Sequence, residues 1–509
     1  MSGEKGRHWA EVTADEIMAA HKGPHEISTG ISPSGEIHIG NLREVITADV
    51  VYRALKERGV DVVLNFVADN FDPLRKVYPF LDASIYNNHI GKPLTAFPCP
   101  CDRHASYADH FLEPFLRSLE RMRIEVKVVY ADKLYASGSL VPQIIQALKG
   151  RDAIARILQE CTGRQVEPEW NPFNPICEAC GRMTEARVTG FSEKNETVDY
   201  TCPCGGKGSV SMSGGGKLTW RADWPARWAR IPVTVEPFGK DHATRGGSYD
   251  SGARICREVY GAPPPFPVTY EWISFKGMGD MSKSKGNVLS VHRMLEVLPP
   301  EVLRYLVVKT RPMRSIAFDP GLPLLNLMDE FDDIASAARD TRALELSAAG
   351  GFKPVGVPFR HLVNVVQMAD LDLEQAVVIL RRNNYPVDDP EALKERAGYA
   401  IRWLHEFAPP EVKFSLQRTL PAAARDLTAA QKKFLGMLAQ ALQPGTSGEA
   451  IHQLIYDVAQ QAGLEKATPA FEAIYRAFLD RPRGPRAGWF LAFLDQPFVL
   501  TRLREAGAA

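Results

Sequence analysis

One stretch near the N-terminus constrains the fold more than any other: Gly30-Ile31-Ser32-Pro33-Ser34-Gly35-Glu36-Ile37-His38-Ile39-Gly40-Asn41. Residues 26–29, which precede it, predict a short strand. Residues 42–58, which follow it, carry apolar side chains at helical spacing and stop at Gly59, a residue typical of helix C-termini. A glycine- and serine-rich turn therefore joins a strand to a helix N-terminus, where backbone N–H groups and the helix dipole favour bound phosphate.

Two polar side chains, His38 and Asn41, fall in the first turn of this expected helix, and both could donate hydrogen bonds to a phosphate. The plainer alternative is a strand–turn–helix corner with a surface histidine, because short motifs have real false-positive rates. Residues 61–68 then predict a buried strand. Strand, helix and strand in this order predict a parallel sheet, whose ligands bind beyond the carboxyl ends of the strands.

The rest of the chain predicts further α/β structure, one insertion and a long helical region. With 509 residues it should hold more than one domain. We expect helices at 109–123, 140–161 and 248–260, strands at 124–130, 232–236 and 267–275, polar loops at 239–242 and 276–287, and mostly helix from 299 onward. Prolines, glycines and paired cysteines indicate a small inserted module at about 167–216.

The composition of the chain excludes few classes of function. The formal net charge is zero, which gives no overall sign of a nucleic-acid partner but leaves room for a local basic face. The chain has no apolar run of about 18 residues, so we expect no membrane helix. Residues 1–12 lack the apolar core of a signal peptide, so we expect a cytoplasmic protein.

A second motif, Gly279-Asp280-Met281-Ser282-Lys283-Ser284-Lys285-Gly286-Asn287, places two lysines in a glycine- and serine-rich loop. Lysine is a compact charge on a flexible stem, which suits it to follow phosphate as negative charge develops. Alone, the segment would be interpreted as a solvated basic loop. An early phosphate corner followed by this loop, after the last strand of an α/β domain, is far more specific than either motif.

Together the two motifs resemble the signatures of class I aminoacyl-tRNA synthetases. The corner is similar to the HIGH sequence, with Asn41 in place of the final His, and the loop to the KMSKS sequence, with Asp280 in place of the first Lys. The runs TGISPSGEIHIGNLRE, PFGKDHATRGGSYDSG and VTYEWISFKG, with the helical C-terminal half, resemble the class I lysyl-tRNA synthetases in particular. The resemblance covers essentially the whole chain. It implies a Rossmann-like α/β catalytic domain with a zinc-binding insertion, followed by an all-α anticodon-binding domain of the α-helix-cage type.

The resemblance also implies the reaction. The carboxylate of L-lysine attacks the α-phosphate of ATP, pyrophosphate leaves, and the lysyl-adenylate acylates the 2′-hydroxyl of the terminal ribose of tRNA(Lys). Mg²⁺ would accompany ATP. His38 and Asn41 would hold the phosphates, and Lys283 and Lys285 would close on the leaving pyrophosphate. The other implied ATP contacts are Pro33, Gly35, Gly40, Gly239, Asp241, Met281, Ser282 and Ser284.

The lysine pocket implied by the resemblance consists of Gly30, Ser32, Trp220, His242 and Tyr270. The two aromatic residues could flank the lysine stem, or they could be core residues. A cationic substrate also needs an acid. Its candidates are Asp69, Asp72 and Glu271, among which the sequence does not choose.

Eight cysteines in a long cytoplasmic chain argue against a disulfide framework. Cys177-x2-Cys180, followed after 21 residues by Cys202-x-Cys204, predicts a structural zinc site. A second set of ligand-type residues, Cys99, Cys101, His104 and His110, suggests a second zinc, although its spacing is irregular and His110 could simply cap or line a helix.

The expected domains follow from these assignments. They are 1–85 and 226–290 for the two halves of the catalytic domain, 86–225 for the insertion, 291–350 for a helical region contacting the tRNA stem, and 351–509 for the anticodon-binding domain. In the last of these, Arg481-Pro482-Arg483-Gly484-Pro485-Arg486 is the best candidate for phosphate contact, although a solvated turn explains it nearly as well.

The sequence leaves three alternative functions to consider. Another class I synthetase, of glutamyl or glutaminyl type, would share both motifs and a helical C-terminal region. A non-tRNA nucleotidylyltransferase of the same superfamily would keep the corner but seldom a zinc insertion and a long helical extension. A binding protein that has lost catalysis is disfavoured by the intact histidine, asparagine and lysines. The sequence does not report the tRNA bases that are read or whether this is the cell's only such enzyme. We expect a monomer.

Overall fold

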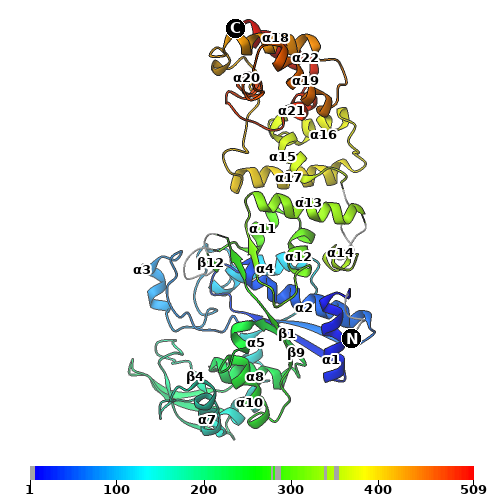
Figure 1. The fold of residues 1–509 in the computed structure, drawn as a ribbon. Coiled ribbons are helices and arrows are strands. Elements are labelled where there is room, and N and C mark those ends of the chain that lie inside the picture. The colour runs from blue at the N-terminus through cyan, green and yellow to red at the C-terminus, as the bar shows by residue number, and fades with distance from the viewer. Residues whose placement is uncertain (1–5, 277–278, 281–287, 338–340, 349–354) are drawn as a thin grey trace. The chain divides into compact units, whose positions relative to one another are not determined.

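The computed structural model describes residues 6–276, 279–280, 288–337, 341–348 and 355–509. The chain divides into two compact units. The first comprises Met1–Leu295, Leu303–Phe318 and Arg342–Gly350, and the second Glu296–Val302, Asp319–Thr341 and Gly351–Ala509. In Figure 1 the first unit runs from blue to green, and the second holds the yellow-to-red helices.

A five-stranded parallel sheet forms the centre of the first unit, with the strand order β10-β9-β1-β2-β3. The strands are β1 (His25–Ile31), β2 (Val62–Ala68), β3 (Lys127–Tyr130), β9 (Val235–Gly239) and β10 (Phe266–Tyr270). The chain builds outward from β1 in one direction and then returns to its other side with β9. The order therefore reverses between β1 and β9, and ligands of doubly wound sheets bind outside the carboxyl ends of the strands at such a point.

The predicted strand–turn–helix corner is confirmed. Helix α2 (Ile39–Glu57) packs on β1, β2 and β9, as Figure 1 shows for β1 and β9. Its apolar side chains, among them Val45, Ile46 and Val50, are fully buried. The helix ends before Gly59, whose φ of +73° is the left-handed conformation that favours glycine. The helix begins at Ile39, so Asn41 lies in its first turn as expected, and His38 is the N-cap residue just before it.

The first unit contains further described elements. They are α1 (Trp9–Ala20), α3 (Ala83–Tyr86), the 3₁₀ turn η1 (Asn87–His89), α4 (Tyr107–Arg121), α5 (Ala131–Ala136), α6 (Val141–Lys149), α7 (Arg151–Thr162), α8 (Trp220–Arg230), α9 (Lys240–Ala243), α10 (Ser248–Glu258), β11 (Ile273–Phe275), β12 (Gly279–Asp280), β13 (Ile316–Phe318) and α14 (Thr341–Ala348). The elements β12, β11 and β13 form a separate three-stranded sheet. Helices α11 (Val291–Val297) and α12 (Pro300–Val308) contribute residues to both units.

Five local predictions were wrong. The strand expected at 232–236 is β9, which spans Val235–Gly239, and the loop expected at 276–287 contains β12. The helix expected at 140–161 is two helices that meet at Gly150, where an added Cβ would lie 2.9 Å from a methyl of Val259. The strand expected at 267–275 is divided between β10 and β11, which belong to different sheets. The loop expected at 239–242 contains most of the short helix α9.

A small β module lies within the insertion. It contains β4 (Phe173–Pro175), β5 (Arg187–Ser192), β6 (Thr197–Thr201), β7 (Lys207–Ser211) and β8 (Gly216–Leu218). The three middle strands form an antiparallel sheet, and β4 pairs with β8. Strand β3 joins the central sheet although it, too, lies within residues 86–225.

The described part of the second unit is mainly helical. Its helices are α13 (Leu322–Ala337), α15 (Phe359–Met368), α16 (Leu373–Arg382), α17 (Pro390–Glu406), η3 (Ala422–Ala424), α18 (Ala429–Ala441), α19 (Gly448–Gln461), α20 (Thr468–Leu479), α21 (Ala487–Phe493) and α22 (Gln496–Ala508). Trp403 is fully buried among them and donates its indole N–H to the Pro320 carbonyl at 2.8 Å. Among the residues described, no helix has both the length and the hydropathy to cross a membrane.

Candidate active site

The corner between β1 and α2 is held by hydrogen bonds from several sides. The backbone N–H of His38 donates to Oδ1 of Asn41 at 3.4 Å, so the amide nitrogen of Asn41 is the group left to donate to a ligand. The Tyr107 hydroxyl donates to the Ser34 carbonyl at 2.9 Å, and the Tyr78 hydroxyl to the Ser34 hydroxyl at 3.3 Å. His38 is 8% exposed. The turn is therefore a rigid platform at the N-terminus of α2.

The chain segment that follows the lysine motif pairs with this corner. Ile39 donates its N–H to the Leu289 carbonyl at 3.1 Å, and Val291 donates to the Ile37 carbonyl at 3.0 Å. The two motifs, about 240 residues apart in sequence, are therefore joined through residues 289–291. The predicted ATP or catalytic residues Met281, Ser282, Lys283, Ser284 and Lys285 lie outside the described residues.

The Gly239-x-Asp241 element lies at the carboxyl end of β9. The Trp272 ring packs so closely on Gly239 that an added Cβ would lie 2.8 Å from it. Asp241 follows in the first turn of α9 and is exposed. Pro33, Gly35 and Gly40 are buried in the corner between β1 and α2. These residues share the carboxyl edge of the sheet, where a nucleotide would bind.

A narrow cavity of about 50 Å³ opens where the strand order reverses. Its walls come from β1, β9, α2, α8, α9, the end of β2 and the residue after it. The lining residues are Ser28, Thr29, Gly30, Glu44, Val67, Asp69, Trp220, Trp224, Arg227, Trp228, Glu236, Pro237, Phe238 and His242. Three of the five predicted lysine residues are among them. Tyr270 contacts the cavity through Glu44, and Ser32 is not in the lining.

Helix α8 supplies an aromatic wall. Trp220 stacks on Trp224, with ring centroids 5.1 Å apart, and Trp224 meets the His242 ring edge-on at 5.5 Å. Tryptophans four residues apart lie on one face of the helix. Burial lowers the pKa of His242, which favours a neutral ring in this aromatic corner. Flat apolar walls and a narrow width suit an unbranched alkyl chain.

Two carboxyl groups in this cavity contact neutral donors. Glu44 accepts from the Gly30 N–H at 3.0 Å and from the Tyr270 hydroxyl at 2.8 Å. Glu236 accepts from the indole N–H groups of Trp224 and Trp228 at 2.9 and 3.1 Å. Within the described residues, no cationic side chain forms an ion pair with either carboxylate.

Burial disfavours the charged form of both groups. It raises the pKa of Glu44 to about 7, although its two hydrogen bonds act in the opposite direction. It raises the pKa of Glu236 to about 8, against the hydrogen bonds from the indoles. A cation bound between them would favour the ionised forms. The cavity is therefore suited to a ligand that carries positive charge.

The third acid in the cavity, Asp69, has protein partners. Its Oδ1 accepts from Arg227 at 2.8 Å, and Lys217 lies 3.6 Å away. The same two cations bind Asp223, at 3.0 and 3.3 Å, and Lys217 also binds Asp72. Three acids thus share two cations in a buried network, which fixes α8 beside the cavity.

The three acids proposed from sequence as partners of the lysine ammonium group therefore lie in different environments. Asp69 lines the cavity, Asp72 is bound by Lys217, and Glu271 pairs with Lys240 at 2.9 Å. Sequence reasoning missed Glu44 and Glu236. Two features of the sequence could have indicated them. Glu44 stands one helical turn after Asn41, and Glu236 is the single acid in the otherwise apolar run Val235–Gly239.

Both predicted metal-ligand sets converge. In the β module, the sulfurs of Cys177 and Cys204 are 3.5 Å apart, and those of Cys180 and Cys202 are 3.9 Å apart. Tetrahedral zinc with Zn–S bonds of about 2.3 Å separates its sulfurs by roughly 3.8 Å. The geometry therefore fits zinc.

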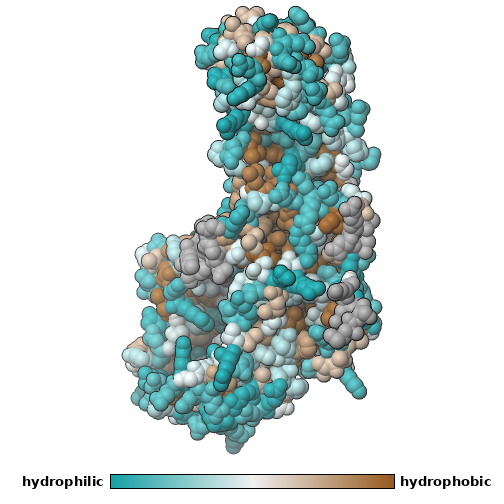
Figure 2. Space-filling model, viewed as in Figure 1, coloured by the Kyte–Doolittle hydropathy of each residue, from teal (hydrophilic) through white to brown (hydrophobic). Residues whose placement is uncertain are grey.

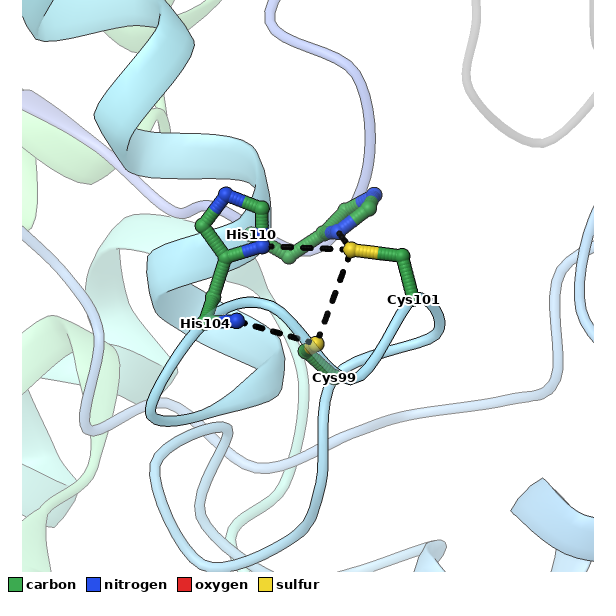
Figure 3. Close-up of side chains that lie close together, drawn as sticks. All are labelled: Cys99, Cys101, His104 and His110. Atoms are coloured by element: carbon green, nitrogen blue, oxygen red, sulfur yellow. Dashed lines mark hydrogen bonds between the residues drawn. The ribbon is translucent and has the colours of Figure 1, made fainter.

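The second set fits equally well. Figure 3 shows its four side chains directed toward one point, three of them from a loop and His110 from α4. The Cys101 sulfur lies 3.7 Å from the Cys99 sulfur, 3.3 Å from Nδ1 of His104 and 3.2 Å from Nδ1 of His110. Cys2His2 is a common structural zinc set.

The sheet order, the corner and the cavity define a nucleotide-binding α/β enzyme with a cation-accepting pocket beside its nucleotide edge. Residues 7–349 match the family model described as tRNA synthetases class I (K), and the chain belongs to this family. It is 47% identical to lysine–tRNA ligase 1 of Methanosarcina acetivorans, covering 98% of each chain. It is also 47% identical to the lysine–tRNA ligase of Archaeoglobus fulgidus, covering 98% of this chain and 100% of the other. A solved glutamate–tRNA ligase from Elizabethkingia meningosepticum aligns at 14% identity over 95% and 99% of the two chains, with a TM-score of only 0.42.

Proposed function

We propose that this protein joins L-lysine to tRNA(Lys) through a lysyl-adenylate, at the expense of ATP. The observation that carries the proposal is the pair Glu44 and Glu236, two buried carboxyls held by neutral donors in one narrow aromatic cavity. The full-length similarity to proteins named lysine–tRNA ligase supports the same substrate.

The charge of the cavity argues against the closest alternative. A glutamate substrate would bring a third carboxylate beside two acids that are already difficult to ionise. The cation that lines the cavity, Arg227, is bound by Asp69 and Asp223. Lysine instead brings a cation, which favours ionisation of both acids, while its four-carbon stem lies along the tryptophan wall.

For the first step, the residues at the sheet edge act by positioning. We propose that His38 and Asn41 hold the ATP phosphates from the N-terminus of α2. Asp241 accepts hydrogen bonds from the ribose, and Gly239 lets the Trp272 ring pack against the end of β9 just before it. Lys283 and Lys285 neutralise the leaving pyrophosphate. Bound Mg²⁺ supplies further charge neutralisation on the phosphates.

We further propose that the helical region 351–509 binds the anticodon and that 291–350 contacts the tRNA stem. The catalytic half consists of 1–85 and 226–290 together with β3, and the insertion comprises the other parts of 86–225. A non-tRNA nucleotidylyltransferase would have no use for the second unit. The enzyme acts as a monomer in the cytoplasm.

Amino-acid-dependent exchange of pyrophosphate into ATP tests the substrate directly. We expect lysine to drive the exchange and glutamate to leave it at background, because only lysine complements the cavity charge. Each reaction is run with and without tRNA, so that a requirement for tRNA is not mistaken for inactivity. Exchange with glutamate but not lysine would refute the proposal. Adenylate formation without charging of any tRNA would favour the nucleotidylyltransferase.

We also propose two structural zinc ions, because both ligand sets have tetrahedral spacing. Elemental analysis of the purified chain should give two zinc ions per molecule. Cys180→Ser and Cys101→Ser should each remove one of them and lower the melting temperature, since metal binding contributes to folding. Cys161→Ala, outside both sets, is the matched control and should retain two. An unchanged zinc count in Cys101→Ser would exclude the second site.

A further inference from the structure

Arg43 places a buried charge next to the lysine cavity. Hydrophilic residues cover much of the face drawn in Figure 2, where charged side chains normally lie. Arg43 is instead 0% exposed, and it directly precedes Glu44 in α2. Burial lowers the pKa of Arg43 to about 10, so the guanidinium remains charged at neutral pH. A buried charge is costly unless hydrogen bonds compensate it, so the partners of this side chain indicate its role.

The guanidinium of Arg43 binds backbone carbonyls from two segments of the chain. Its Nη1 donates to the Trp272 carbonyl at 3.1 Å. Its Nη2 donates to three carbonyls of the turn that follows α12, those of Arg311, Pro312 and Arg314, at 3.4, 2.9 and 2.6 Å. The planar fork of arginine can reach separate acceptors in this way, whereas the three donors of a lysine share one nitrogen. Arg43 therefore clamps both segments to α2.

The clamped segments have little apolar packing of their own. Glu271 and Trp272 form the crossover that joins β10 of the central sheet to β11 of the three-stranded sheet. The Glu271 N–H donates to the Pro312 carbonyl at 2.9 Å, so the crossover and the turn are also bound to each other. The side chains of the turn are exposed or partly exposed, and Met313 is 56% exposed. Hydrogen bonds, with Arg43 at their centre, therefore set the position of the crossover.

The crossover is flanked by residues of both predicted subsites. Tyr270, immediately before it, donates its hydroxyl to Glu44 at 2.8 Å in the lysine cavity. The ring of Trp272 packs on Gly239, the first residue of the predicted ribose-binding element. The guanidinium of Arg43 also lies 6.0 Å from the centroid of the Tyr270 ring. A displacement of the crossover would therefore move a donor of the cavity and a neighbour of the nucleotide edge together.

We propose that Arg43 is a positioning residue for the reaction, which sets the geometry of the lysine cavity and of the nucleotide edge through the segment from Tyr270 to Trp272. Arg43 is not in the lining of the cavity, and both its Nη atoms are bound to carbonyls, so it acts through these neighbours. A misplacement of about 1 Å can cost about a hundredfold in rate with every reacting group present. The inference rests on the proposed function, which supplies lysine and ATP as the two ligands.

Arg43→Lys is the direct test, because it keeps the positive charge but cannot bind both segments at once. We expect the KM for lysine and the KM for ATP to rise together in the exchange assay, each about three- to tenfold, the size expected for lost hydrogen bonds to a charged group. Arg43→Gln, which leaves no buried charge, replaces this variant if it does not fold, and should raise both KM values in the same way.

Arg304→Lys is the matched control for the loss of a buried guanidinium. Arg304 is 1% exposed and also binds carbonyls, those of Leu346 and Ser347, at 2.6 and 3.1 Å. None of these residues lines the cavity. The control should lower the melting temperature, as Arg43→Lys does, and leave both KM values unchanged.

A double-mutant cycle shows through which residue Arg43 acts. In a Tyr270→Phe background, Arg43→Lys should raise the KM for lysine little further, because the hydroxyl that it positions is already absent. Its effect on the KM for ATP should persist. Additive effects on the KM for lysine, or KM values equal to those of the unmodified enzyme, would overturn the inference and leave Arg43 a role in folding alone. The KM for ATP is measured with whichever amino acid drives exchange, so a wrong lysine assignment would not be mistaken for a failure of this inference.

Discussion

Replacing Glu44 by glutamine is expected to lower kcat/KM for lysine by about a hundredfold or more, measured as lysine-dependent exchange. Removing one partner of a buried, hydrogen-bonded charge pair costs about 2–5 kcal/mol. The variant keeps the shape of the side chain and can still accept from the Gly30 N–H or the Tyr270 hydroxyl. The loss should therefore reflect charge, and it should appear chiefly in the KM for lysine.

Two further variants sharpen this prediction. Tyr270→Phe removes only the hydroxyl that donates to Glu44 and should have a smaller effect, of severalfold. Glu16→Gln, at an exposed acid of α1, is the control and should match the unmodified enzyme. Discrimination between lysine and its uncharged isostere norleucine should collapse in Glu44→Gln. If that discrimination persists, the ammonium group binds elsewhere.

The parts of the fold that could be predicted from sequence are those with local causes. The apolar periodicity of α2 and the glycine after it act within a few residues, and so does the turn before it. The cysteine sets could be found because metal ligands must be of particular types and close in space. The strand order could be anticipated only in outline, because nothing local specifies that β9 lies beside β1.

The acids of the cavity could not be selected from sequence, for a physical reason. The chemistry of a carboxyl group depends on its burial and its partners, which distant segments supply. Asp72 and Asp69 looked equivalent until Lys217 and Arg227, about 150 residues later, proved to be their counter-ions. Burial raises the pKa of Glu44, and the hydrogen bond from Tyr270, 226 residues away, partly opposes that rise. The family resemblance located the cavity but not its charge.

The affinity for lysine should depend on pH, because the two carboxyl groups of the cavity, Glu44 and Glu236, titrate near neutrality. The pKa of Glu44 is about 7 and that of Glu236 about 8, whereas the lysine ammonium loses its proton only near 10.4. Between pH 8 and pH 7 the ligand must displace one proton, and below pH 7 it must displace two, so kcat/KM for lysine should fall about tenfold and then about a hundredfold per pH unit. Between pH 8 and 9.5 it should level off. Asp69, whose pKa is raised by burial, also faces the cavity, as does its partner Arg227. A profile flat from pH 6 to 8 would contradict the assignment.

The same acids should make the ligand-free protein less stable in alkali. Glu236 has a higher pKa folded than unfolded, so its contribution to stability is complete below about pH 4.5 and is lost as pH rises through 8. Glu236→Gln abolishes this loss, worth up to about 5 kcal/mol for a shift of this size. The melting temperature of Glu236→Gln minus that of the unmodified protein should therefore increase between pH 5 and pH 9. Any destabilisation from placing the glutamine amide N–H against an indole N–H is the same at both pH values, so it does not change this trend. Saturating lysine should reduce the difference at pH 9, because the ammonium stabilises the ionised carboxyl; a difference that does not change with pH would show that Glu236 is already ionised when the pocket is empty.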